Sequence, residues 1–120
     1  MSGSLNKMMI IGNVGRDPEM RFTQAGTAVC SFSVGVSYKD ETEWFNIVTW
    51  NKLAETCNTL VTKGRKVYVE GRMKTRSWDD KTSGEKKYRT ELVAGVLVLL
   101  DSKPGDTNTV PEIEDDSIPF

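Results

Sequence analysis

Histidine is absent from this sequence, and cysteine is scarce, with Cys30 and Cys57 as its two examples. The cysteines are 27 positions apart and form no CxxC pattern, so the chain offers neither a zinc ligand set nor a cysteine–histidine nucleophile. Acid–base catalysis would depend on carboxylates, but the two adjacent acidic pairs, at 79–80 and 115–116, lie in a polar turn and in the C-terminal tail. We therefore expect a protein that is not an enzyme and binds no metal and no cofactor, with both cysteines as small buried hydrophobic residues.

Long hydrophobic runs are also missing. The longest apolar or glycine stretch, VAGVLVLL at residues 93–100, is far shorter than the roughly 20 residues of a membrane helix. The N-terminal MSGSLNK lacks the charged and apolar regions of a signal peptide. With 120 residues, 38% of them hydrophobic and 28% charged, the chain is typical of one soluble domain. We expect a cytoplasmic protein with no membrane partner.

Charge is unevenly distributed along the chain. Residues 101–120 contain six acids and one base, a net charge of −5. The remaining 15 basic and 11 acidic residues give residues 1–100 a net charge of +4. A basic body with an acidic tail is often found in nucleic-acid-binding proteins that carry a separate interaction tail.

Strand patterns dominate the body. Residues 26–37 alternate apolar and polar side chains, and extended segments are also expected at 5–14, 42–50, 65–78 and 87–100, with a polar connection at 15–22 that leads into a further extended piece. Apolar residues at helical spacing predict one amphipathic helix over 51–64. From Asp101 onward, turn-forming residues and acids without periodicity predict a disordered tail.

The order strand, strand, strand, helix, strand, strand is typical of a small Greek-key barrel. The sequence therefore predicts an all-β fold with one short helix, in which residues 1–100 form a five-stranded OB-fold barrel and residues 101–120 a disordered acidic C-terminal tail. An SH3-like barrel or a half-open sandwich would fit the same pattern.

The segment TEWFNIVTW, residues 42–50, places two tryptophans on one side of a strand. Successive strand residues point to opposite faces, so Trp44 and Trp50 share a face, whereas Phe45 and Ile47 lie on the other, which has the aliphatic character of a core. The tryptophans either pack under a loop or in a subunit interface, or they are displayed. Trp78 also ends the polar side of its strand, and this shared placement favours display.

Cations lie beside these aromatics. Arg72, Lys74 and Arg76 alternate along the strand that ends at Trp78, and Tyr38 stands at the loop before the first tryptophan. Binding single-stranded nucleic acid requires cations along the phosphates and flat rings on which unpaired bases stack, and an OB barrel brings such residues together on one face. The alternative is a solvated cationic strand beside buried tryptophans.

The tail tip, EDDSIPF, combines acids with a terminal apolar anchor. Exposed apolar residues at a disordered end gain nothing from water, so Ile118, Pro119 and Phe120 indicate a ligand for a pocket with basic residues and a hydrophobic floor.

The chain resembles the bacterial single-stranded DNA-binding proteins. The resemblance lies in NKMMIIGNVGRDPEMRFTQAGTAVCSFSVGV (6–36), TEWFNIVTWNKLAETCNTLVTKGRKVYVEGRMKTRSW (42–78) and DDSIPF (115–120), which appear in the order of that family. It implies an OB fold, assembled as a homotetramer, that coats single-stranded DNA without sequence preference during replication, recombination and repair. It also implies a nucleoid-associated cytoplasmic protein whose tip recruits replication and repair proteins.

The resemblance also implies roles for single residues. Trp44 and Trp78 match the family's stacking tryptophans, Trp50 stands at another stacking position, and Tyr38 takes the place of a further tryptophan. The matched basic positions near the DNA path are Lys7, Arg16, Lys52, Lys74 and Arg76. The partner-binding tip corresponds to Asp115, Asp116, Ser117, Ile118, Pro119 and Phe120. Two other functions are open on the residues alone: an OB-fold module that binds RNA, and an adaptor that acts mainly by recruiting proteins.

Overall fold

The structure is a computed structural model that describes residues 3–101 and 112–114. Its strands are β1 (Met8–Val14), β2 (Glu19–Phe22), β3 (Ala28–Tyr38), β4 (Glu41–Trp50), β5 (Lys66–Asp79), β6 (Lys86–Leu99) and β7 (Glu112–Glu114), and the helix in this part of the chain is α1 (Asn51–Leu60). The predicted all-β fold with one short helix is confirmed.

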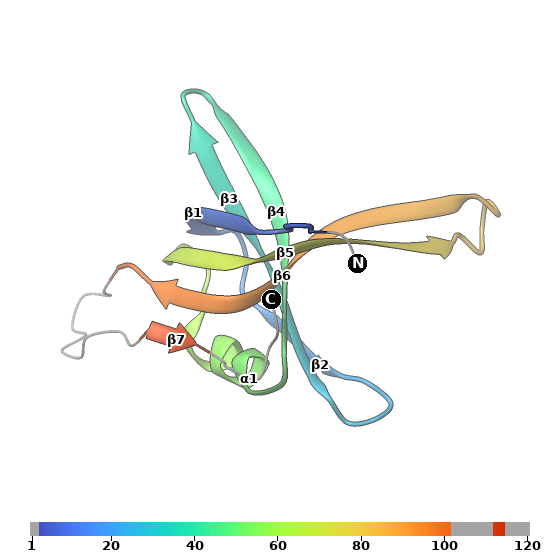
Figure 1. Cartoon of the computed structure of the whole chain (residues 1–120), viewed down its shortest axis with the longest axis horizontal. Coiled ribbons are helices and arrows are strands. Elements are labelled where there is room, and N and C mark those ends of the chain that lie inside the picture. Colours follow the sequence, from blue (N-terminus) through green and yellow to red (C-terminus); the bar gives the residue numbers. More distant parts are fainter. Residues whose placement is uncertain (1–2, 102–111, 115–120) are drawn as a thin grey trace.

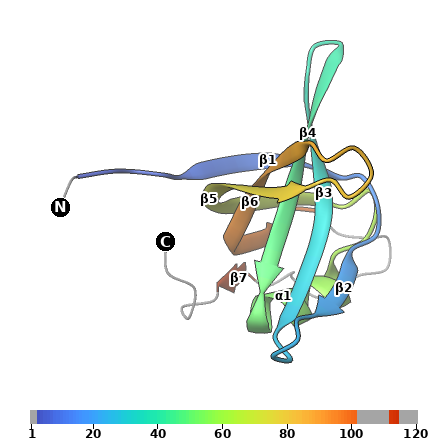
Figure 2. The same ribbon diagram turned by 90° about the vertical axis from the view of Figure 1, so that its right-hand side faces the viewer.

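Five strands close into a barrel. β1 pairs with β5 and, through Asn13 and Val14, with β3; β3 pairs with β4. β4 runs parallel to β6 at Ile47 and Val48, and β6 returns to β5. The ring is therefore β1–β3–β4–β6–β5, with α1 between β4 and β5 in the chain, which is the OB arrangement predicted from the sequence. β2 extends the sheet at the outer edge of β3 (Figure 1; Figure 2).

Inward side chains at alternate strand positions form the core. Phe32 and Ile47 are buried there, and α1 contributes Leu53 and Cys57 to the same cluster. Burial raises the pKa of Cys57 to about 12 and that of Cys30 to about 11, so both thiols stay protonated and unreactive at neutral pH. The prediction that both cysteines are buried is confirmed.

The helix is shorter than the sequence predicts. α1 ends at Leu60 instead of Gly64, because Val61 takes an extended conformation (φ −83°, ψ 129°) and buries its side chain in the core. Gly64, with φ +90°, lies in the turn that leads into β5, where the left-handed conformation favours glycine.

Two hairpins, β3–β4 and β5–β6, project beyond the barrel (Figure 1). In the described chain, β5 pairs with β1 only as far as Gly71, and from Lys74 to Asp79 it pairs with β6 alone. A β-bulge between Glu70 and Gly71 lies near the point where this arm leaves the barrel. A Cβ at Gly71 would collide with the carbonyl oxygen of Val93, so the close approach of β6 requires glycine here.

The folded body continues to Asp101, one residue beyond the predicted boundary. The buried Arg65 donates from Nε to the Asp101 carboxylate at 2.9 Å and from Nη2 to its carbonyl at 3.0 Å. Burial acts to raise the pKa of Asp101, but the hydrogen bonds from Arg65 and the backbone outweigh it and hold that pKa below its ordinary value. Asp101 therefore fixes the end of β6.

One short strand departs from the predicted tail. β7 pairs with β6 from Val96 to Val98, beyond the point where β6 leaves β4, so it occupies backbone groups that β4 does not reach. The sequence contains no strand signal at 112–114. The expected disorder of the remaining tail, residues 102–111 and 115–120, lies outside the described residues.

Candidate nucleic-acid interface

One outward face runs across β2, β3, β4, β6 and the outer half of β5. The register places Trp44 beside Gly35, Trp50 beside Val29 and Val48 beside Val93, so these strands continue one another's outer surface. We call this surface the stacking face. Its members include Arg21, Trp44, Asn46, Val48, Trp50, Arg72, Lys74, Arg76, Trp78, Lys87, Arg89 and Glu91.

The outer edge of the Trp44 ring packs against two glycines. A Cβ built on Gly35 would meet its indole carbons at 2.9 and 3.0 Å, and a Cβ on Gly15 would meet the same two carbons more closely still. The two glycines therefore make room for the edge of the indole, while 59% of the residue stays exposed. An aromatic ring that is held at its edge and largely exposed is suited to stack against a planar base.

Replacing Gly35 by alanine is expected to displace this ring. Gly35 does not have a positive φ, so the strain comes from the collision between the new methyl group and Trp44. We expect a change in the exposure of the indole to acrylamide, and a loss of oligothymidine affinity of up to about 1–3 kcal/mol, the contribution of one stacked base. Gly3→Ala, which meets nothing within 4 Å, is the control. A variant with unchanged indole exposure and affinity would contradict this role of Gly35.

The other two tryptophans are also displayed. Trp50, at the end of β4, is 36% exposed, and Trp78, on the β5–β6 arm, is 44% exposed. The Arg76 guanidinium lies 5.4 Å from the centroid of the Trp78 ring, a cation–π contact that orders both side chains. The prediction that the tryptophans are displayed is confirmed, because all three rings reach the surface of the same face.

Exposed cations lie on the same face as the three rings. Arg72, Lys74 and Arg76 are exposed along β5, and Arg16 reaches this face from the β1–β2 connection. Arg76 is partly engaged, since its Nε lies 3.2 Å from a carboxylate oxygen of Glu91. The face is therefore positively charged, and Glu91 forms ion pairs with two of its arginines, Arg76 and Arg89.

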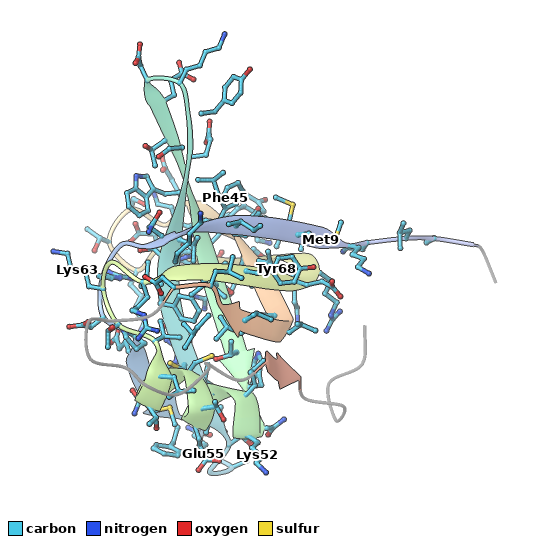
Figure 3. All side chains as sticks on the ribbon, turned by 90° about the vertical axis from the view of Figure 1, so that its left-hand side faces the viewer. Met9, Phe45, Lys52, Glu55, Lys63 and Tyr68 are labelled. Carbon is cyan, nitrogen blue, oxygen red and sulfur yellow. The ribbon has the colours of Figure 1, made fainter. Side chains whose placement is uncertain are left out.

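Two predicted residues, Tyr38 and Lys7, lie away from this group, and a third, Lys52, lies two residues beyond Trp50. Tyr38 pairs with Glu41 at the tip of the β3–β4 hairpin, on the opposite side of the ribbon from Trp44, with Lys39 Nζ 5.5 Å from its ring centroid. Lys7 lies beside Glu70 on β5, with Nζ 3.5 Å from the carboxylate. Lys52 is exposed on α1, at the end of the molecule away from the hairpin tip (Figure 3).

Sequence reasoning missed a polar cleft on the stacking face. Arg21, Asn46, Arg89 and Glu91 line it together with the predicted Arg16 and Arg76. Arg89 donates from Nη2 to the Asn46 side-chain oxygen at 2.8 Å, across β6 and β4. The alternation of side chains along β6 predicts that Arg89 faces outward. Only the pairing of strands shows that β4, which carries Asn46, lies beside it.

The chemistry of this face is that of binding. It offers open rings, cations and hydrogen-bond donors, and within residues 3–101 and 112–114 no group of three metal-ligating side chains occurs. In that same part of the chain, no helix has the length and apolar character needed to cross a membrane. The predicted partner-binding tip, Asp115 to Phe120, lies outside the described residues.

Comparisons with known proteins agree with this geometry. A family described as "Single-strand binding protein family" matches residues 5–100. Single-stranded DNA-binding protein 1 of Chlorobaculum tepidum is 45% identical over 118 residues, which cover 91% of this chain and 73% of that protein. The single-stranded DNA-binding protein of Rickettsia typhi is 38% identical, with both chains covered completely.

A solved structure has the same fold. The Plasmodium falciparum SSB complex with ssDNA superposes with a TM-score of 0.76 at 32% identity, covering 84% of this chain and 99% of that one. That protein was solved with a DNA strand bound, so the fold shared with this chain is one that accommodates single-stranded DNA.

Proposed function

The chain belongs to the single-strand binding protein family, and we propose that it binds single-stranded DNA on its stacking face. It is not an enzyme: it holds the strand without sequence preference and changes no bond in it. The observation that carries the proposal is the display of Trp44, Trp50 and Trp78 on one cationic face.

The binding mechanism follows from these side chains. Each base stacked on an indole contributes about 1–3 kcal/mol, and because every base has a π-face, the gain is nearly independent of sequence. Arg72 and Lys74, exposed between the tryptophans, offer positive charge to the phosphates that connect the stacked bases. Neutralising phosphates releases counterions, so affinity falls as salt concentration rises.

Titration of intrinsic tryptophan fluorescence with polythymidine at two salt concentrations tests the function. We expect deep quenching as bases cover the exposed rings, with weaker affinity at the higher salt concentration. Binding without quenching would move the DNA away from the stacking face, and absence of binding would overturn the proposal.

The chain divides functionally into two parts under this proposal. Residues 1–100 are the DNA-binding domain, and residues 101–120 are a tail whose tip recruits replication, recombination and repair proteins. The support for the tip is its chemistry, a run of acids followed by the apolar Ile118, Pro119 and Phe120. A protein with these partners acts in the cytoplasm, at the nucleoid.

A separate apolar surface supports assembly into a homotetramer. Met9 and Ile11 on β1 are 59% and 50% exposed, and the register places Ile11 beside Tyr68 of β5 and Tyr68 beside Val98 of β6. Figure 3 shows Met9 and Tyr68 on these neighbouring strands. Exposed apolar side chains on β1, next to half-buried Tyr68 and Val98 on the neighbouring strands, are typical of a contact between subunits.

Ile11→Glu is expected to dissociate the assembly, because it places a charge within this apolar surface. Light scattering after size exclusion should change from four times the 13.4 kDa chain mass towards a smaller species. Phe22→Glu, at a 65% exposed apolar residue on β2, is the matched control. An Ile11→Glu protein that keeps the wild-type mass would exclude this surface as the contact.

A further inference from the structure

The polar cleft lies between two of the displayed rings. On β4, Asn46 and Val48 separate Trp44 from Trp50 on the same face, and both line the cleft. Four arginines and two glutamates also line it: Arg16, Arg21, Arg76, Arg89, Glu19 and Glu91. The cleft is therefore cationic, and none of the three displayed tryptophans lines it.

Arg89 is held in this cleft with hydrogen-bond donors left over. Its Nη2 donates to Asn46 at 2.8 Å, and its Nε lies 3.7 Å from a carboxylate oxygen of Glu91, too far for a hydrogen bond. The Nε–H is buried and has no hydrogen-bond partner among the described residues. The other Glu91 oxygen is 3.2 Å from Arg76 Nε, so this carboxylate forms ion pairs with both guanidinium groups.

A bound strand must cross this region. Trp44 and Trp50 are six residues apart, or about 20 Å along β4. Stacked nucleotides advance by about 3.4 Å along a strand, so bases on the two rings cannot be adjacent and the intervening backbone passes over the cleft. The groups that this backbone presents are phosphates, which are acceptors for guanidinium donors.

We propose that the cleft holds a phosphodiester group of the bound strand, with Arg89 as its hydrogen-bond donor and Arg16 and Arg21 as flanking cations. Asn46 and Glu91 are positioning residues that orient the Arg89 guanidinium. The inference rests on the proposed function, because it requires bases on Trp44 and Trp50.

The salt dependence of polythymidine affinity tests the inference in the full-length protein. Arg89→Gln should lower the slope of log affinity against log salt by about 0.7, the value for one phosphate contact on a single strand. The quenching amplitude at saturation should stay at the wild-type level, because the rings remain. Arg89→Lys keeps the charge and should keep most of the slope. Lys66→Gln, on an exposed lysine about 33 Å from Arg76 along β5, is the matched control and should leave the slope unchanged.

The outcomes separate this inference from the function on which it rests. A wild-type protein that binds with deep quenching, and an Arg89→Gln variant with the wild-type slope, would overturn the phosphate site alone. If Arg89→Gln instead changes the preference between thymidine and guanosine strands, Arg89 contacts a base edge and the phosphate site is overturned. If the wild-type protein shows neither binding nor quenching, the proposed function itself fails. If Arg89→Gln does not fold, Arg21→Gln carries the same expectation for the slope.

Discussion

The double substitution Trp44→Ala/Trp78→Ala is expected to reduce the affinity for polythymidine by at least about 30-fold. Each lost ring removes about 1–3 kcal/mol of stacking, and the two rings lie on different strands, 59% and 44% exposed. The remaining quenching should come from Trp50 alone. Fluorescence of the single and double variants, and anisotropy of a labelled strand, measure both effects.

Tyr88→Ala is the control for this experiment. Tyr88 is 67% exposed on the same arm, but it lies next to Lys87 and Arg89 in β6 and therefore on the opposite side of the ribbon. Its removal should leave affinity unchanged. If the double tryptophan variant binds as tightly as the Tyr88 variant, the strand does not stack on this face.

Gly71→Ala is expected to lower the free energy of unfolding by about 3 kcal/mol. The added methyl group would collide with the backbone of β6 at Val93 and Ala94, which cannot rotate away as a side chain would. Overpacking costs about 1–3 kcal/mol when neighbours can adjust, and here the neighbour is a strand of the closed barrel. For a domain of this size, we expect the melting temperature to fall by about 10–20 °C.

Urea unfolding and thermal melts measure this effect. Ser77→Ala, an exposed position six residues further along β5, is the control and should melt near the wild-type temperature. A Gly71→Ala protein with wild-type stability would mean that the bulge can open to admit a side chain.

The sequence predicts the barrel well because its signals are local. Period-two alternation identifies the inward face of β3 and the outward tryptophans, and the order of elements identifies the OB arrangement. The predicted length of α1 was wrong. A helical pattern of apolar residues cannot show that Val61 has an extended backbone and buries its side chain in the core. The pairing of β7 with β6 was missed because it depends on an edge that exists only after the barrel closes.

The site was predicted in part, and its omissions depend on strand register. Tyr38 and Trp44 have the same parity in the sequence, but Tyr38 pairs with Glu41, and this register puts even positions of β3 opposite odd positions of β4. The same limit hides the contact between Arg89 and Asn46, 43 residues apart, and the packing of Gly15 and Gly35 against the edge of Trp44. The distribution of charge along the sequence reveals a basic body that contains the three tryptophans, whereas the pairing of strands decides which cation lies beside which ring.

The packing of Gly15 and Gly35 against the edge of Trp44 bears on how a strand would leave the protein. Because these two glycines hold the indole at its edge, a base that stacks on it under the proposed function would meet a ring that is already in place. A motor advancing along the DNA would then have to lift one base off this ring, at a cost of about 1–3 kcal/mol, before it met the next contact. Removal would proceed as a series of small steps, so tight coverage of the strand is compatible with rapid clearance ahead of a moving enzyme.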